Sequence, residues 1–126
     1  GVETRLPILF SKGVSEGRIS LNQFVALSAT NHAKVYGMYP QKGTIAIGSD
    51  ADIAIWDPAK RVTLSQSMLN HNCDYTPYEG MELSGYPVTV ISRGELVAEN
   101  GRPVGSGGRG KFVHRGKSSL VPSRRS

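Results

Sequence analysis

The spacing of apolar positions predicts two helices in the first third of the chain. The first covers residues 4–13, with Thr4 as its N-cap, Pro7 in its first turn and Gly13 at its end. Proline is tolerated in a first turn because the amide hydrogen that it lacks has no helical partner there. One face of this helix carries the apolar side chains Leu6, Leu9 and Phe10.

The second predicted helix, over residues 20–36, has clear signals at both ends. Ser20 followed three residues later by Gln23 matches a capping box. Gly37 is expected just after the helix, and Pro40 prevents its continuation. A stripe of small residues runs along it, namely Ala26, Ala29 and Ala33. Small residues let a neighbour approach closely, so we expect protein on two sides of this helix, including a partner surface that the sequence does not contain.

The remainder of the chain predicts strands and loops. Residues 43–58 hold two short Ile-rich runs around a Gly-Ser-Asp-Ala-Asp turn, and each run is too short for a stable helix. We therefore predict two strands there, of which the second extends toward Val62 and Leu64. A second strand pair is predicted at residues 88–98, with its turn at Ser-Arg-Gly-Glu. Residues 65–87 between the two pairs are predicted to form a long irregular loop.

Composition and charge narrow the class of protein. The 126 residues suffice for one small domain, and no run of about 18 apolar residues predicts a membrane span. The net charge is +5, but seven of the 15 basic residues and none of the 10 acids lie from Arg102 onward. The basic segment 105–126 is rich in Gly and Ser, so we expect an arm that lies on another surface rather than a nucleic-acid-binding face.

The ends and the single cysteine add two expectations. The chain lacks an initiator Met and an apolar leader, which predicts a fragment or a processed piece. Cys73 is the only cysteine, so no intrachain disulfide can form, and a reducing, cytoplasmic setting is expected.

Two clusters contain side chains that metal sites use. Ser49, Asp50 and Asp52 supply oxygen atoms at a turn, but the Gly at position six and the distant Glu of a calcium loop are absent. We interpret them as turn-forming residues. The second cluster is His71, Cys73 and Asp74. It lacks the ligand spacings of zinc sites, and loop neighbours rarely form a Cys–His nucleophile pair, so a hydrogen-bonded loop is predicted.

The other candidates are isolated. His32 lies within the second predicted helix, where a core or interface histidine is expected, and His114 lies in the basic tail and is expected to be exposed. Three glutamates lack a carboxylate partner at a spacing that suggests acid–base catalysis: Glu3, Glu16 and Glu79. The Gly-rich run at 105–110 has no Lys-Ser/Thr end, so it is not a phosphate-binding loop. We predict no catalytic, substrate-binding or metal-binding residue in this chain.

Residues 43–58 also carry a resemblance. Gly-Thr-Ile-Ala-Ile-Gly-Ser-Asp-Ala-Asp-Ile-Ala-Ile-Trp-Asp-Pro resembles the strand pair that follows the last barrel helix in the amidohydrolase superfamily. Residues 30–37 and 72–81 extend the likeness, and Asp-Tyr-Thr-Pro-Tyr-Glu-Gly at 74–80 narrows it. Over about residues 1–115, the chain resembles the C-terminal part of the D-hydantoinase/dihydropyrimidinase group of cyclic amidohydrolases.

The resemblance implies an α/β fold, in which a (β/α)₈ barrel is joined to a small β-sandwich built from both chain ends. Residues 1–42 would be terminal helices of the barrel. Residues 43–104 would be C-terminal strands of the sandwich, interrupted by the loop at 65–87, and residues 105–126 would be the basic tail.

The resemblance also implies an activity for a larger parent protein. Members of the group open the cyclic amide of hydantoins or dihydropyrimidines with two divalent metal ions, usually zinc, held by an HxH pair, a carboxylated lysine, two more histidines and an aspartate. The three histidines of this chain match none of those positions, so the chain alone would bind no metal and be inactive. The alternative is a non-enzymatic dihydropyrimidinase-like scaffold protein.

The implied partners follow from the same resemblance. They are the rest of the barrel, the small cyclic amide that the parent would bind, and the other subunits of a homotetramer, reached through the C-terminal segment. No nucleic-acid or membrane partner is expected.

Overall fold

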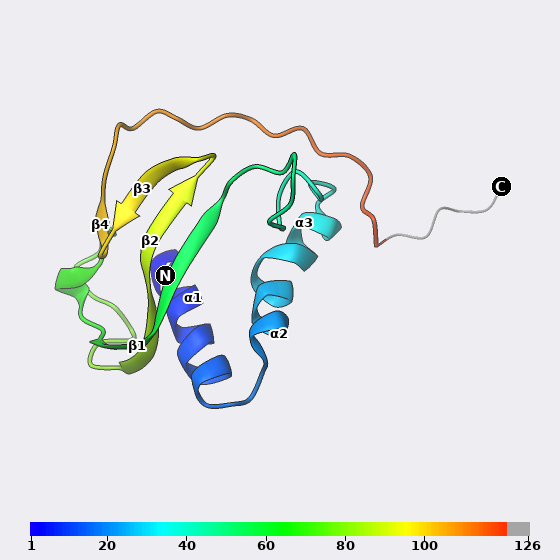
Figure 1. Ribbon diagram of the computed structural model, residues 1–126. Helices are drawn as coiled ribbons and strands as arrows, with labels where there is room; N and C mark the ends of the chain where they lie inside the picture. The colour runs from blue at the N-terminus through cyan, green and yellow to red at the C-terminus, as the bar shows by residue number, and fades with distance from the viewer. Residues whose placement is uncertain (121–126) are drawn as a thin grey trace.

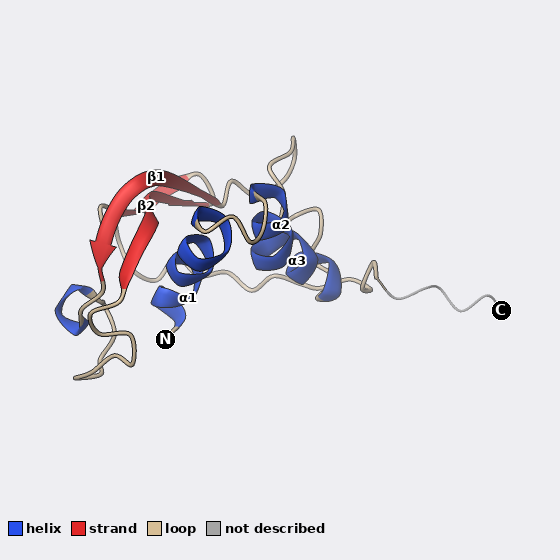
Figure 2. Cartoon of the chain, turned by 90° about the horizontal axis from the view of Figure 1, so that it is seen from below, coloured by secondary structure: helices blue, strands red, loops and turns tan. Residues whose placement is uncertain are grey.

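The computed structural model describes residues 1–120, which form a pair of helical segments beside an antiparallel sheet (Figure 1). The helical segments run from α1 through η1 and, after a short connection, from α2 through η2 to α3. Figure 2 shows the helices on one side of the two long strands. The bounds are α1 Val2–Leu9, η1 Phe10–Ser15, α2 Leu21–Val25, η2 Ala26–Thr30, α3 Asn31–Val35, β1 Ile53–Thr63, η3 Gln66–Met68, β2 Glu82–Ser92, β3 Glu95–Glu99 and β4 Arg102–Pro103.

The first helical segment is longer than predicted at both ends. It begins at Val2 with Gly1 as its N-cap, so Thr4 lies inside the helix, where it is buried and donates its hydroxyl hydrogen to the Gly1 carbonyl at 3.2 Å. Gly13 does not end the segment, because η1 continues to Ser15. A Cβ at Gly13 would lie 2.9 Å from the Ile19 side chain. Gly13 therefore lets Ile19 pack closely against the helix. The predicted N-cap, Thr4, and the predicted helix end, Gly13, were both wrong.

The second helical segment confirms its predicted ends. The Gln23 amide donates to Ser20 Oγ at 3.1 Å, and the Ser20 amide donates to Gln23 Oε1 at 2.8 Å, which completes the capping box. At the other end, Tyr36 is the C-cap and Gly37 follows with a φ of 69°. This left-handed backbone is favourable for glycine, which explains why the helix ends there.

The four strands form one sheet in the order β1-β2-β3-β4, with neighbours antiparallel. β1 bends where its pairing shifts from Asp57 opposite Tyr86 to Arg61 opposite Ser84. The β2–β3 turn has positive φ at Arg93 and Gly94, and the β3–β4 turn has positive φ at Asn100 and Gly101. The strand pair predicted at residues 88–98 is thereby confirmed, and Asn-Gly is a residue pair that such turns favour.

The first of the two strands predicted at residues 43–58 is absent from the described residues, which have turns and irregular backbone there. The side chain of Ile45 is 80% exposed and that of Ile47 is fully exposed. A strand needs a partner for its backbone hydrogen bonds, and no described strand lies beside this run. The second strand is confirmed as β1, which extends past Val62 to Thr63.

The long loop predicted at residues 65–87 is shorter, because β2 already begins at Glu82. Leu83 and Tyr86 are buried in β2, and Leu64 joins them in a core cluster. Gly85 has a φ of 87°, and a Cβ there would lie 2.3 Å from Phe10 Cε1. Gly85, which lies in the predicted loop, is therefore the point where the ring of Phe10 approaches the strand.

Three aromatic rings join the helices to the sheet. Phe10 of η1 stacks on Trp56 of β1 with centroids 4.6 Å apart. Phe24 of α2 meets both rings edge-on, at 5.4 Å from Phe10 and 5.5 Å from Trp56. Edge-to-face and stacked pairs are favourable aromatic geometries, so this cluster fixes the position of the helices against β1.

Within residues 1–120, no helix is long and apolar enough to cross a membrane.

Candidate functional site

The two aspartates of the 49–52 turn are held by a lysine that precedes them. Lys42 Nζ lies 2.9 Å from Asp50 Oδ2 and 2.5 Å from Asp52 Oδ2. Gln41 Nε2 also donates to Asp50, at 3.1 Å, and the Arg93 amide donates to Asp52 Oδ1 at 2.9 Å. The cluster joins the segment after α3 to the β2–β3 turn, so its evident role is to hold these two parts of the chain together.

The charges of this cluster are mutually stabilised. The hydrogen bond from Lys42 lowers the pKa of Asp50. For Asp52, partial burial opposes ionisation, but Lys42 and the Arg93 amide outweigh it and the pKa is lowered. The hydrogen bond to Asp52 raises the pKa of Lys42. All three groups are therefore charged at neutral pH, and a metal would have to displace Lys42 to reach both carboxylates.

Ser49 is also engaged, since its hydroxyl donates to the Pro40 carbonyl at 2.7 Å. Sequence reasoning identified the aspartates but missed Lys42. The signal that could have revealed this ion pair is that Lys42 is the only lysine between Gly37, which ends the helix, and the acidic turn. Across the described chain, no group of three or more His, Cys, Asp or Glu side chains could hold a metal ion.

The residues of the His71 cluster are not gathered into a site. The Cys73 thiol is exposed, and its backbone carbonyl accepts a hydrogen bond of 2.9 Å from Gln66 Nε2. The ring nitrogen Nε2 of His71 is buried without a hydrogen-bond partner. Asp74 is exposed. With the thiol in solvent and no basic nitrogen hydrogen-bonded to it, the arrangement has no activated nucleophile.

The glutamates hold loops and helix ends in place. The two oxygens of Glu3 accept hydrogen bonds from the amide and side chain of Asn70, at 2.8 and 2.9 Å, so they link the 65–81 loop to α1. Glu79 Oε2 accepts from the Gln66 amide at 2.7 Å within the same loop. Glu16 pairs with both Lys12 and Arg18, and the hydrogen bond from Lys12 lowers the pKa of Glu16.

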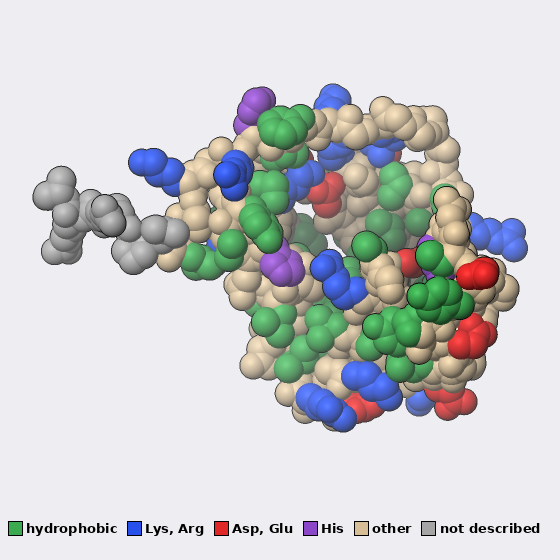
Figure 3. Space-filling model, turned by 180° about the vertical axis from the view of Figure 1, so that it is seen from behind, with side chains coloured by type: hydrophobic (Ala, Val, Ile, Leu, Met, Phe, Trp, Pro, Cys, Tyr) green, Lys and Arg blue, Asp and Glu red, His purple; other side chains and the backbone are tan. Residues whose placement is uncertain are grey.

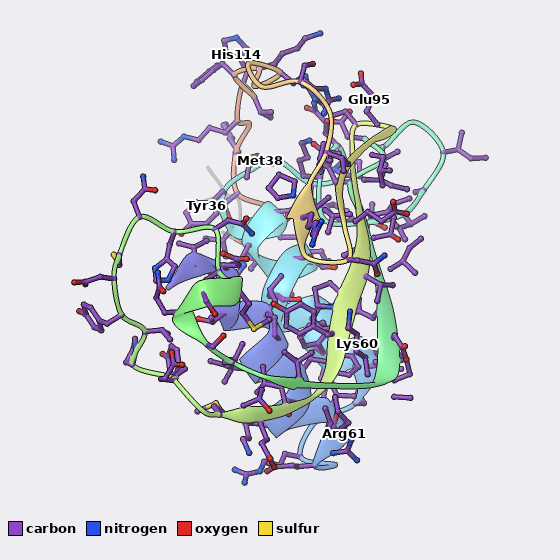
Figure 4. All side chains as sticks on the ribbon, turned by 90° about the vertical axis from the view of Figure 1, so that its left-hand side faces the viewer. Tyr36, Met38, Lys60, Arg61, Glu95 and His114 are labelled. Carbon is purple, nitrogen blue, oxygen red and sulfur yellow. The ribbon has the colours of Figure 1, made fainter. Side chains whose placement is uncertain are left out.

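The two remaining histidines are both exposed, as was expected of His114. His32 is therefore not a core residue, and an interface position for it stays a prediction. His32 Nδ1 lies 3.3 Å from the Ser28 carbonyl on its own helix. The His114 ring meets Phe112 edge-on within the arm, with centroids 4.9 Å apart. Figure 4 places His114 and Glu95 toward one end of the molecule, with Lys60 and Arg61 toward the other. These residues do not converge on one point.

The arm begins beside the sheet. Arg109 Nε lies 2.7 Å from Glu95 Oε2, and its guanidinium donates to the Ser92 carbonyl at 3.1 Å. The guanidinium of Arg93 in turn donates to the carbonyl of Arg109. The Gly-rich run 105–110 thus contacts the β2–β3 turn of its own chain through Arg109.

The arm then crosses to the end of α3, as Figure 1 shows. The Gly116 amide donates to the Gly37 carbonyl at 2.7 Å, and the Ser119 amide donates to the Lys34 carbonyl at 3.2 Å. A Cβ at Gly37 would lie 2.1 Å from Gly116 O, so the contact is close. The described part of the arm therefore lies on its own helix and sheet, whereas residues 121–126 of the predicted tail fall outside the described part of the chain.

Two grooves flank the helices. A polar groove of about 1190 Å³ runs between η1 and the bend of the β1–β2 pair. Its polar groups satisfy one another: Ser15 Oγ donates to the Ser84 carbonyl at 2.8 Å, the Ser84 amide donates to Ser11 Oγ at 2.9 Å, and Arg61 donates to Ser84 Oγ. Two carboxylates line the groove outside that network, Glu16 and Glu82, and Glu16 is paired with Lys12 and Arg18.

An apolar groove of about 640 Å³ lies between the α2–α3 segment and β1. Phe24, Ala33 and Trp56 are among its lining residues. A surface of this kind binds apolar side chains. The titratable residues that also line it are His32 and the ion-paired Lys42, Asp50 and Asp52. Hydrophobic side chains reach the surface over the helical part of the molecule, as Figure 3 shows. The groove is therefore a surface suited to packing against other apolar side chains.

Comparison with known proteins gives the context for this surface. The model of the Amidohydrolase family matches residues 3–97. The D-hydantoinase of Ralstonia pickettii is 51% identical over 117 residues, which are 93% of this chain and 25% of that protein. The dihydropyrimidinase of Rattus norvegicus is 44% identical over 115 residues, which are 91% of this chain and 22% of that protein. The chain thus spans about a quarter of the length of these relatives.

Solved structures agree with the sequence matches. A D-hydantoinase structure that is 51% identical superposes with a TM-score of 0.89 over 94% of this chain and 26% of its own. The dihydropyrimidinase of Brevibacillus agri NCHU1002, 49% identical, superposes with a TM-score of 0.86 over 93% of this chain and 25% of its own. By its sequence and its fold, the chain belongs to the amidohydrolase family.

Proposed function

We propose that this chain is the C-terminal part of a metal-dependent hydrolase that opens the cyclic amide of hydantoins or dihydropyrimidines. Its own contribution is to complete the fold and to supply oligomer contacts. The observation that carries the proposal is the 51% identity to a D-hydantoinase over 93% of the chain. Identity of that level along nearly the whole chain favours a parent protein of the D-hydantoinase kind, in which this chain occupies the same position as the matching segment of the relative.

The metal site of such a parent does not fit the residues of this chain. The acidic pair Asp50 and Asp52 is bound by Lys42, and His32 and His114 are exposed on separate elements. His71 is the one histidine whose buried nitrogen lacks a partner, but no group of ligands surrounds it among residues 1–120. We therefore assign the two divalent metal ions and the substrate pocket to the part of the parent outside this chain.

The same proposal assigns a structural role to each part of the chain. Residues 1–42 supply terminal barrel helices, residues 43–104 supply strands of the small sandwich, and residues 105–126 form the basic tail. The tail would reach other subunits of a homotetramer from its position across α3. The single, exposed Cys73 suits a reducing cytoplasm.

An assay of the isolated chain tests the assignment of the metal site. The purified 126-residue chain is incubated with zinc and either hydantoin or dihydrouracil, with zinc alone as the control. We expect no hydrolysis above the control, because the ligands and the groups that grip the ring amide lie elsewhere. Turnover by the chain itself would contradict this assignment.

The rest of the parent sequence distinguishes an enzyme from a scaffold. An HxH pair after the first barrel strand and a mid-barrel lysine are expected of a hydrolase, because together they hold the two metal ions. A parent without them would be a non-enzymatic dihydropyrimidinase-like scaffold. In that case the hydrolase part of the proposal would be abandoned and the structural part kept.

A further inference from the structure

The arm covers a hollow that is lined mainly by cations. After β4, the arm passes over the end of the sheet on its way to α3 (Figure 1). Residues 109–113 form one wall of a hollow of about 480 Å³, and the β2–β3 turn and the segment after α3 form the others. Its basic lining residues are Lys42, Arg93, Arg109 and Lys111. Among the described residues that line it, Asp50 is the one acid.

Two of the four cations are already paired with carboxylates. Lys42 lies between Asp50 and Asp52, and Arg109 pairs with Glu95 at 2.7 Å. Four cations therefore stand against three carboxylates at this site, which leaves it with a net positive charge.

Arg93 and Lys111 are the two cations that remain available. In the described chain, neither forms an ion pair. The half-buried guanidinium of Arg93 donates a hydrogen bond to the carbonyl of Arg109. A guanidinium has five N–H donors, so most of those on Arg93 are unused. Its charge lowers the pKa of Asp50, after the larger effects of Lys42 and Gln41, so Arg93 acts on the same hollow.

The backbone of the arm adds further unused donors. The amides of residues 110–113 donate no hydrogen bond to the described part of the chain. The acceptors of the hollow, in contrast, are occupied. Lys42 and Gln41 donate to Asp50, and Arg93 donates to the carbonyl of Arg109. A lining with free donors, free positive charge and occupied acceptors favours an anionic ligand.

We propose that this hollow binds a phosphate group, carried by a small molecule or present as the free ion. The planar fork of Arg93 matches two phosphate oxygens, and the Lys111 ammonium adds a second positive charge. Two unpaired cations suit the charge of between one and two that a phosphate group carries near neutral pH, whereas a carboxylate would leave one cation unmatched.

The proposed site differs from a phosphate-binding loop in its construction. Such a loop holds phosphate with amides at the start of a helix, and no helix of the described chain begins beside this hollow. Here side-chain cations from the arm and the β2–β3 turn would do most of the binding. The inference goes beyond the proposed function and does not depend on it, because only residues of this chain form the hollow.

Titration with inorganic phosphate tests the proposal. The protein is a chimera, the Ralstonia pickettii D-hydantoinase with its matching 117 residues replaced by this chain. One variant carries Lys111→Met and the matched control carries Lys117→Met. Both lysines are exposed on the same arm, but only Lys111 lines the hollow. The two variants therefore lose the same charge from the same segment, and thermal melting checks that both remain folded.

Binding is measured by calorimetry at constant ionic strength, because salt screens exposed charges. We expect saturable binding with a dissociation constant of about 1 mM or lower. Lys111→Met should weaken it about fivefold or more, and Lys117→Met less than about twofold.

Three results would overturn the assignment. One is the absence of saturable binding up to about 10 mM phosphate. Another is equal weakening by the two variants, which indicates diffuse attraction to the arm, or no weakening by Lys111→Met, which places the phosphate elsewhere in the chimera. The third is acetate binding as tight as phosphate binding, which assigns the hollow to carboxylates.

Hydantoin hydrolysis by the same chimera separates this inference from the proposed function. A chimera that binds phosphate through Lys111 but is inactive supports the phosphate site and counts against the proposed function alone. An active chimera without phosphate binding does the reverse.

Discussion

Substitution of Gly85 by alanine tests the contact between η1 and β2 that positions the helices on the sheet. A Cβ at this site would lie 2.3 Å from Phe10 Cε1 and 2.5 Å from Phe10 Cδ1, and the backbone φ is 87°. An alanine in a left-handed backbone costs about 1–2 kcal/mol. Forcing a methyl group into a packed core costs about 1–3 kcal/mol more. We therefore expect Gly85→Ala to destabilise the protein by roughly 2–5 kcal/mol.

Gly80→Ala is the matched control for the backbone contribution. Its φ is 78°, but nothing lies within 4 Å of a Cβ at that position, so only the conformational cost remains. The variants are made in the same chimera, the Ralstonia pickettii D-hydantoinase with its matching 117 residues replaced by this chain. Thermal unfolding of the chimera should give a clearly lower midpoint for Gly85→Ala than for Gly80→Ala. Adding Phe10→Leu should lessen the effect of Gly85→Ala, because the smaller side chain can yield. Equal losses at the two glycines would refute the reasoning.

Three further outcomes are expected. Lys42→Met should destabilise the chimera by about 1 kcal/mol or less at neutral pH, because its ion pairs are partly exposed. The pKa values of Asp50 and Asp52 are lowered in the folded state, so this difference from the unsubstituted chimera should be present above their ordinary value of 3.8 and disappear as pH falls below it. Arg109→Ala removes the ion pair with Glu95, so trypsin should cut the arm faster than it does in an Arg102→Ala control. The isolated chain should bind a hydrophobic dye and aggregate or melt without cooperativity, because its groove is uncovered; a sharp melt of a monomer would contradict this.

Local signals in the sequence predicted the features that local chemistry determines. Ser20 and Gln23 satisfy each other's amides whatever surrounds them, so the start of the second helical segment could be predicted. Gly37 and the Asn100-Gly101 pair occupy backbone with positive φ. Because Gly and Asn adopt this conformation more readily than other residues, the residue type itself indicates a helix end or a turn. The family could also be predicted, because it is recognised from short runs of residues, and such runs keep the same sequence in a fragment.

Features that depend on distant partners could not be predicted in the same way. The Ile45 run has the composition of a strand, but no strand of the described chain lies beside it, so it does not form a strand here. Gly13 suggested a helix end, and Gly85 fell within the predicted loop, whereas each glycine accommodates a side chain from another segment. Lys42 was overlooked because its ion pairs with Asp50 and Asp52 depend on how the chain folds back after α3.

The central claim is that this chain is the structural quarter of a cyclic amide hydrolase. Hydantoin turnover by the chimeric Ralstonia pickettii D-hydantoinase tests it most directly. The account predicts that the chimera, loaded with zinc, hydrolyses hydantoin within about tenfold of the unaltered enzyme, because the replaced quarter holds no catalytic group. A chimera that folds and melts cooperatively but has no activity would contradict the claim.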